Sequence, residues 1–152
     1  MKWLRIGLWF LTVTQVLVGG VQLLLPKVFY EDFPWPSDPW VSMLPPYNEH
    51  LMRDVGALNL SLAIFVGAAA IYLERRLMIG SLLGYLAFAL PHAIFHATHL
   101  EHFQTGDAIA QTILLFGAVL IPLLLLIPAL RIRPTAGKPG KSPDTPAGSS
   151  PL

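Results

Sequence analysis

Four of the chain's five histidines lie close together, at His92, His96, His99 and His102. Imidazole can bind a transition metal, ligate haem or exchange a proton near neutral pH, so this cluster is the first candidate for chemistry. On an α-helix, at about 100° per residue, the first three fall within about 60° of one another, and His102 lies about 60° further round if the helix continues. The spacing therefore predicts three imidazoles that face the same way.

The chain around these histidines is strongly apolar. Hydrophobic residues make up 54% of it and charged residues 12%, whereas an average soluble domain has about 25% charged residues. The mean hydropathy is +0.58. Four apolar runs each approach the roughly 20 residues that a helix needs to cross the hydrocarbon core. We place them at about 3–25, 55–73, 77–98 and 108–130, which predicts an all-α fold: an integral membrane four-helix bundle over residues 1–130.

Two features of the sequence bear on how the chain sits in the membrane. The first apolar run is long for a secretory signal and lacks a small-x-small cleavage site, so we expect it to be retained. In an even-helix topology one side of the membrane receives most of the basic residues: Lys2, Arg5, Arg75, Arg76, Arg131, Arg133, Lys138 and Lys141. By the positive-inside rule, this distribution predicts a multi-pass protein of the bacterial inner membrane with both termini in the cytoplasm.

Two segments outside the helices have distinctive compositions. Residues 26–50 contain many prolines, which forbid a long helix. They also contain many aromatic residues, and Trp and Tyr favour the headgroup level of the membrane. We predict an outer loop that serves either as an interfacial anchor or as a lid over a ligand site. Residues 131–152 are rich in Pro, Gly and Ser, which predicts a disordered cytoplasmic tail.

Polar residues from every helix are expected to meet in the outer half of the bundle. Lipid offers no hydrogen-bond partners, so polar atoms in a membrane protein must find one another. Two i,i+4 pairs, Glu49 with Arg53 and His50 with Asp54, open the second helix, where ionised groups are costly unless paired or hydrated. Further polar residues at a similar depth are Gln22, Glu101, Asp107 and Gln111.

The leading hypothesis for this polar site is a transition metal, with Zn, Cu or Fe as the candidates. Imidazole is a common ligand for these ions, and neighbouring carboxylates can orient it. The chain has no cysteine, so thiolate sites and disulfides are excluded. The candidate ligands are His92, His96, His99, His102, His50 and Asp54, and the supporting residues are Glu49, Arg53, Gln22, Gln111, Glu101 and Asp107.

Three alternatives to the metal stay open. Haem b could be held by two histidines from facing helices, for instance His50 and His96. A polar pocket could bind a small molecule or lipid, with His and Asp as acid and base or as hydrogen-bond partners. The chain could also be a non-enzymatic accessory subunit whose polar core is structural and holds no cofactor.

The sequence leaves enzymatic activity open and restricts the partners. Serine nucleophile elbows, phosphate-binding glycine loops and dinucleotide fingerprints are absent. The basic residues form no stripe with interleaved aromatics, so no nucleic acid is expected. The expected partners are the lipid bilayer and either other membrane proteins or further copies of this chain.

The stretch "YNEHLMRDVGALNLSLAIFVGAAAIYLERRLMIGSLLGY", from Tyr47 to Tyr85, resembles the DoxX-like group of small four-helix bacterial membrane proteins. In that group the second helix starts with an acidic or Asn residue and an Arg, continues with "GALxLxLA", and a basic turn leads into the third helix. The resemblance implies the four-helix membrane fold and a subunit of a quinone-linked oxidoreductase. The histidine cluster lies outside the matching stretch.

Overall fold

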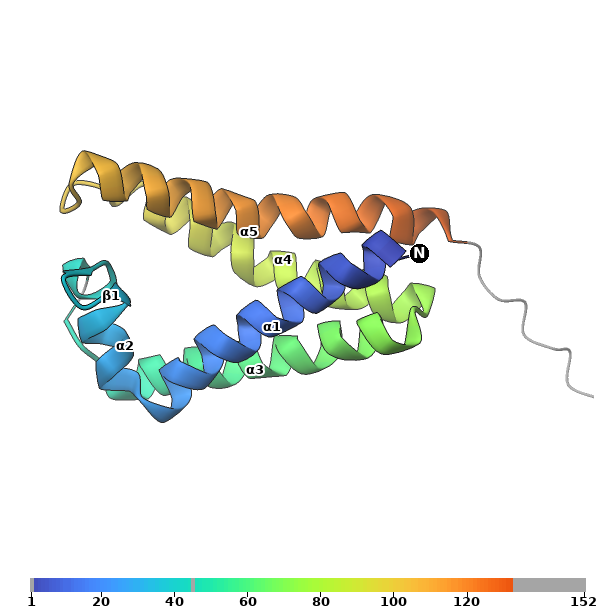
Figure 1. Ribbon diagram of the computed structural model, residues 1–152, viewed down its shortest axis with the longest axis horizontal. Coiled ribbons are helices and arrows are strands. Elements are labelled where there is room, and N and C mark those ends of the chain that lie inside the picture. Colours follow the sequence, from blue (N-terminus) through green and yellow to red (C-terminus); the bar gives the residue numbers. More distant parts are fainter. Residues whose placement is uncertain (1, 45, 133–152) are drawn as a thin grey trace, which may run out of the picture.

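The computed structural model describes residues 2–44 and 46–132, and four long helices dominate it (Figure 1). They run alternately up and down as α1 (Lys2–Leu24), α3 (Glu49–Tyr72), α4 (Arg75–Ala97) and α5 (Thr105–Arg131). Each is long and apolar enough to cross a membrane. The predicted all-α fold with four helices of membrane-spanning length is therefore confirmed. Nearly all of the predicted tail, from residue 133 onward, lies outside the described residues.

Capping residues define both ends of α3 and the start of α4. The Leu51 N–H donates to the Asn48 side chain at 3.0 Å, so α3 begins at Glu49 rather than at the predicted residue 55. Leu73 ends α3 in a left-handed conformation with φ 50°. The Glu74 carboxylate then accepts from the N–H groups of Arg76 and Leu77, at 3.0 and 2.7 Å, and so starts α4. These contacts satisfy backbone groups that a helix end leaves without partners.

The end of α4 changes the geometry expected for the histidines. The helix stops at Ala97, and Thr98 caps it with a hydroxyl that donates to the Ile94 and Phe95 carbonyls at 3.0 and 2.9 Å. His99 and the residues after it therefore lie beyond the helix. Helical spacing relates only His92 and His96, which corrects the prediction of three imidazoles on one helical face.

The bundle is built from two pairs of helices. α1 packs mainly on α3, and α4 packs mainly on α5 (Figure 1). Glycines allow the first pair to come close: a Cβ added to Gly56 would lie 2.6 Å from the backbone N of Leu23 and 2.9 Å from the carbonyl O of Gly19. The fully buried core includes Leu8, Leu11, Val66, Met78 and Leu82.

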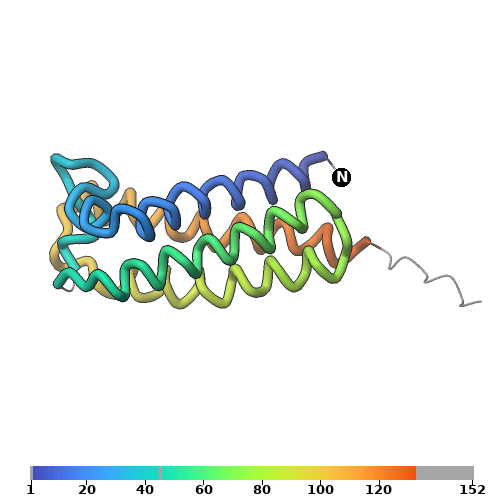
Figure 2. The backbone as a smooth tube through the Cα atoms, turned by 90° about the horizontal axis from the view of Figure 1, so that it is seen from below, coloured from blue at the N-terminus to red at the C-terminus, as the bar shows by residue number. Residues whose placement is uncertain are grey.

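The proline-rich loop folds into a cap over one end of the bundle. It consists of α2 (Pro26–Asp32), the antiparallel strands β1 (Pro34–Trp35) and β2 (Asp38–Pro39), and the short 3-10 helix η1 (Val41–Met43). Phe29 is buried in the cap and stacks on Phe33, with ring centroids 4.5 Å apart. The N-terminus, the turn between α3 and α4 and the end of α5 all lie at the opposite end of the molecule (Figure 2). We call the cap end outer and the opposite end inner.

Candidate functional site

One line of residues along α4 changes from buried to exposed toward the cap end of the molecule. Met78, Tyr85, His92 and His96 share this line, because steps of seven and four residues return to nearly the same side of a helix. Met78 and Tyr85 are buried, at 0% and 3% exposure. His92 is exposed and His96 half-buried. In Figure 1 the ribbons of the two helix pairs draw apart toward the cap end, and along α4 the exposure changes from buried at Tyr85 to exposed at His92.

A hydrogen bond joins α4 to α5 in the outer half of the bundle. The Nδ1 of His96 is 2.7 Å from the Oε1 of Gln111, and the Gln111 residue is only 3% exposed. Its Nε2 is buried and has no hydrogen-bond partner within the described part of the chain. The amide can be oriented either way round, but one of its two polar atoms lacks a partner in both orientations. A buried polar atom without a partner costs about 1–3 kcal/mol.

His92 lies directly beside this hydrogen bond. Its ring meets the His96 ring edge-on, with centroids 4.6 Å apart, and stacks on Phe88 at 5.3 Å. Among the described residues no protein group is hydrogen-bonded to the His92 ring nitrogens. The site therefore offers two imidazoles and one amide beside aromatic and apolar side chains, and we call it the His92/His96/Gln111 site.

Buried amides connect the helices elsewhere in the bundle. The Asn59 amide N donates to the Gln22 Oε1 at 2.7 Å, joining α3 to α1, and Gln22 is thus occupied by a structural contact. Tyr85 of α4 is hydrogen-bonded to Gln15 of α1. Asn59 and Tyr85 were missed by the sequence analysis. Asn59 had a usable signal, since it is a single amide in the middle of the apolar α3 and lies one turn after Gly56.

The two pairs predicted at the start of α3 are both present, but they form on its exposed surface. His50 Nε2 lies 3.3 Å from Asp54 Oδ2, and an Arg53 Nη2 lies 2.8 Å from Glu49 Oε1. Arg53 also donates to the Leu23 carbonyl at the end of α1. Exposed pairs of this kind contribute about 0–1 kcal/mol each, so we assign them a local role at the outer end of the α1/α3 pair.

The remaining predicted histidines have local partners beyond the end of α4. The His99 ring stacks on Phe95 with centroids 4.1 Å apart, and its Nδ1 is 2.8 Å from the Phe95 carbonyl. His102 Nε2 lies 4.0 Å from Glu101 Oε1. Phe95, His99, Glu101 and His102 line a surface hollow of about 430 Å³ together with residues of the cap.

The geometry gives the metal hypothesis no support. Across residues 2–44 and 46–132, no three or more His, Asp or Glu side chains come together in a group that could hold a metal ion. The physical reason is that the six candidate ligands fall into three separate sets. His92 and His96 lie together on α4, His99 and His102 follow the end of that helix, and His50 pairs with Asp54 on α3.

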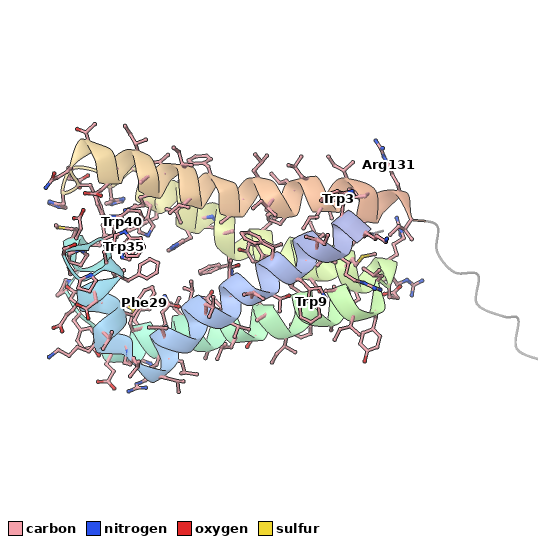
Figure 3. The ribbon with its side chains drawn as sticks, viewed as in Figure 1. Trp3, Trp9, Phe29, Trp35, Trp40 and Arg131 are labelled. Atoms are coloured by element: carbon pink, nitrogen blue, oxygen red, sulfur yellow. The ribbon has the colours of Figure 1, made fainter. Side chains whose placement is uncertain are left out.

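Asp107, predicted as a supporting residue, has a partner that the sequence did not indicate. Its carboxyl group lies beside that of Asp38 in strand β2, which brings the cap and the start of α5 together at this point. Partial removal from water raises the pKa of Asp38, and the charge of Asp107 and the hydrogen bond to it raise the pKa further. Trp35 and Trp40 lie at the edge of the cap nearest to α5 (Figure 3). We therefore expect the protonation of this carboxyl pair to affect the contact between the cap and α5.

The fold and the site define a class: a small all-helical protein with four helices of membrane-spanning length and polar residues in the outer half of the bundle. Comparison of the chain with protein-family models, curated proteins and solved structures finds no match. The similarity of Tyr47–Tyr85 to the DoxX-like group therefore stays a prediction.

Proposed function

We propose that this chain is a multi-pass membrane protein that binds a small, lipid-soluble molecule at the His92/His96/Gln111 site. One observation carries the proposal. Gln111 is buried, one atom of its amide is bonded to His96, and the other atom has no partner among the described residues, at the point where the α4 line changes from buried to exposed. A ligand oxygen or N–H at this point would satisfy the amide.

The side chains around the site indicate the chemistry of the ligand. A neutral imidazole supplies one donor and one acceptor, and a free amide atom supplies one more. The neighbouring Phe88, Ala89 and Ala93 are apolar and favour a largely apolar body. We therefore propose a molecule with one or two carbonyl or hydroxyl oxygens on an apolar frame, such as a quinone or a fatty-acyl lipid. Such a molecule would reach the site from the bilayer, since His92 is exposed.

The proposed location is the bacterial inner membrane, with the capped end outside. The described basic residues at the inner end are Lys2, Arg5, Arg75, Arg76 and Arg131. Basic residues are concentrated on the cytoplasmic side of membrane proteins, which favours a cytoplasmic N-terminus and a cytoplasmic end of α5. The His92/His96/Gln111 site would then lie in the outer leaflet.

Mass spectrometry of purified protein tests the proposal. The full chain is extracted from membranes in mild detergent without a histidine tag, and the organic extract is compared between wild type and the double variant His96→Leu/Gln111→Leu. We expect an apolar molecule that the wild type retains and the double variant loses. Thr112→Val is the matched control, because the Thr112 hydroxyl donates only to the Ala108 carbonyl of its own helix, at 2.7 Å.

The same preparation separates the competing hypotheses. If the wild type contains about one equivalent of Zn, Cu or Fe, and changing His92 and His96 to Ala removes it, the site binds a metal through its imidazoles and the proposal is wrong. A haem absorption band would select haem b. Protein that contains neither a metal nor a retained small molecule would favour the structural accessory subunit.

A further inference from the structure

A groove at the inner end of the molecule is not part of the His92/His96/Gln111 site. It has a volume of about 520 Å³ and is lined by Lys2, Arg5, Ile6, Trp9 and Leu73. This volume lies within the roughly 300–1,000 Å³ of typical small-molecule sites. Four of the five lining residues belong to α1, and Leu73 is the residue that ends α3.

The groove changes from charged to apolar along α1. Residues 2, 5, 6 and 9 share one side of the helix because they are spaced by three and four residues. Lys2 and Arg5 stand at the terminal end, and Ile6 and Trp9 follow at 57% and 42% exposure. The same side continues with Val13 and Val16, which are 51% and 47% exposed. A molecule with an anionic head and an apolar chain matches this order.

The electrostatics of the inner end also favour an anion. Within the described residues, Glu74 is the only carboxylate there, and it is already engaged at the start of α4. The N–H groups of Arg76 and Leu77, followed by the two nearby arginines, hold the pKa of Glu74 below its ordinary value. Lys2 and Arg5 have no acidic partner in the described part of the chain. Trp9 is of the type that lies at the boundary between headgroups and hydrocarbon.

We infer that this groove binds one anionic phospholipid of the inner leaflet, with its phosphate between Lys2 and Arg5 and an acyl chain along Ile6 and Trp9. Basic pockets on the cytoplasmic side of membrane helices are suited to such headgroups. The inference does not depend on what the His92/His96/Gln111 site binds.

Native mass spectrometry of the full chain in detergent tests the inference, with phosphatidylglycerol and phosphatidylcholine titrated separately. We expect tighter binding of phosphatidylglycerol, and a loss of about fivefold in its affinity for each of Lys2→Gln and Arg5→Gln, the effect expected of one cation near an anionic lipid. Arg131→Gln is the matched control: it removes a cation at the same end outside the groove and should leave the affinity unchanged. Equal binding of the two lipids, or an equal loss in Arg131→Gln, would overturn the inference.

A second measurement follows the acyl chain. Phosphatidylglycerol with brominated acyl chains should quench the tryptophan fluorescence of the wild type, and Trp9→Leu should remove part of that quenching. Trp35→Leu, in the cap at the other end, should not change the quenching by bound lipid (Figure 3). Quenching that is independent of Trp9 would exclude the groove as the binding site. Inorganic phosphate is added as a competitor at the same concentration as the lipid. If it displaces the lipid completely, the acyl chain contributes nothing to binding, which would also contradict the inference.

Discussion

His96 of α4 and Gln111 of α5 are joined by a hydrogen bond of 2.7 Å, and the second polar atom of the buried Gln111 amide has no partner in the described part of the chain. Buried amides usually bond both of their polar atoms, whereas Gln111 and Asn59, each at 3% exposure, both leave one atom without a partner in the described residues. The Gln111 amide lies beside His92 and His96, where the α4 line changes from buried to exposed, which is why we place the ligand there.

Replacing His96 tests whether the hydrogen bond stabilises the ligand-free bundle. His96→Leu leaves both polar atoms of the Gln111 amide buried without partners, so we expect a loss of about 1–3 kcal/mol in the free energy of unfolding. The double variant His96→Leu/Gln111→Leu removes both partners and should recover most of this loss. Thermal unfolding in detergent, followed by circular dichroism, measures both. If the double variant is less stable than His96→Leu, the hydrogen bond between His96 and Gln111 does not stabilise the ligand-free bundle.

A methyl group at Gly56 should disrupt the contact between α1 and α3. Its Cβ would lie 2.6 Å from the Leu23 backbone N, and backbone atoms cannot move aside as a flexible side chain can. We expect Gly56→Ala to destabilise the protein by about 1–3 kcal/mol, the usual cost of overpacking. Gly84→Ala is the matched control, since, apart from its chain neighbours and the nearby backbone of its own helix, no heavy atom of the described residues lies within 4 Å of its added Cβ. Equal stabilities of the two variants would show that the helices do not cross at Gly56.

The contact between Asp38 and Asp107 should make the cap sensitive to pH. The folded state raises the pKa of Asp38, so its stabilising contribution is complete below the ordinary pKa of an aspartate and is lost as the pH rises through the raised pKa. We expect hydrogen exchange in residues 34–43 to accelerate over that range, because two ionised carboxylates repel. Asp38→Asn should flatten the dependence, and Asp54→Asn, at the exposed pair on α3, should leave it unchanged. The same pH profile in wild type and Asp38→Asn would refute this role.

Local patterns in the sequence predicted the helices and the short-range pairs. Apolar runs indicated four spans, and i,i+4 spacing predicted the pairs Glu49 with Arg53 and His50 with Asp54. These features depend on residues close in the chain. The end of α4 was harder to predict from the sequence. Thr98 caps the helix by donating its hydroxyl to carbonyls of the preceding turn, so His99 does not align with His92 as expected.

Contacts between distant elements could not be predicted from periodicity. The sequence indicated polar residues at a common depth, but it did not show that His96 would meet Gln111 or that Asp38 would meet Asp107. Both contacts depend on how the helix pairs and the cap are placed relative to one another. The six proposed metal ligands illustrate the same limit, since a common depth did not bring them into one group.

The most direct test of the central claim is the nuclear magnetic resonance signal of the Gln111 side-chain amide. Spectra of the ¹⁵N-labelled full chain are compared before and after bound small molecules are removed by exhaustive detergent exchange, with Gln111→Leu used to assign the signal. We predict that removal shifts the Gln111 amide and the His96 ring, while the Asn59 amide, bonded to Gln22, stays in place. A Gln111 signal that is identical before and after removal would contradict a ligand at this site.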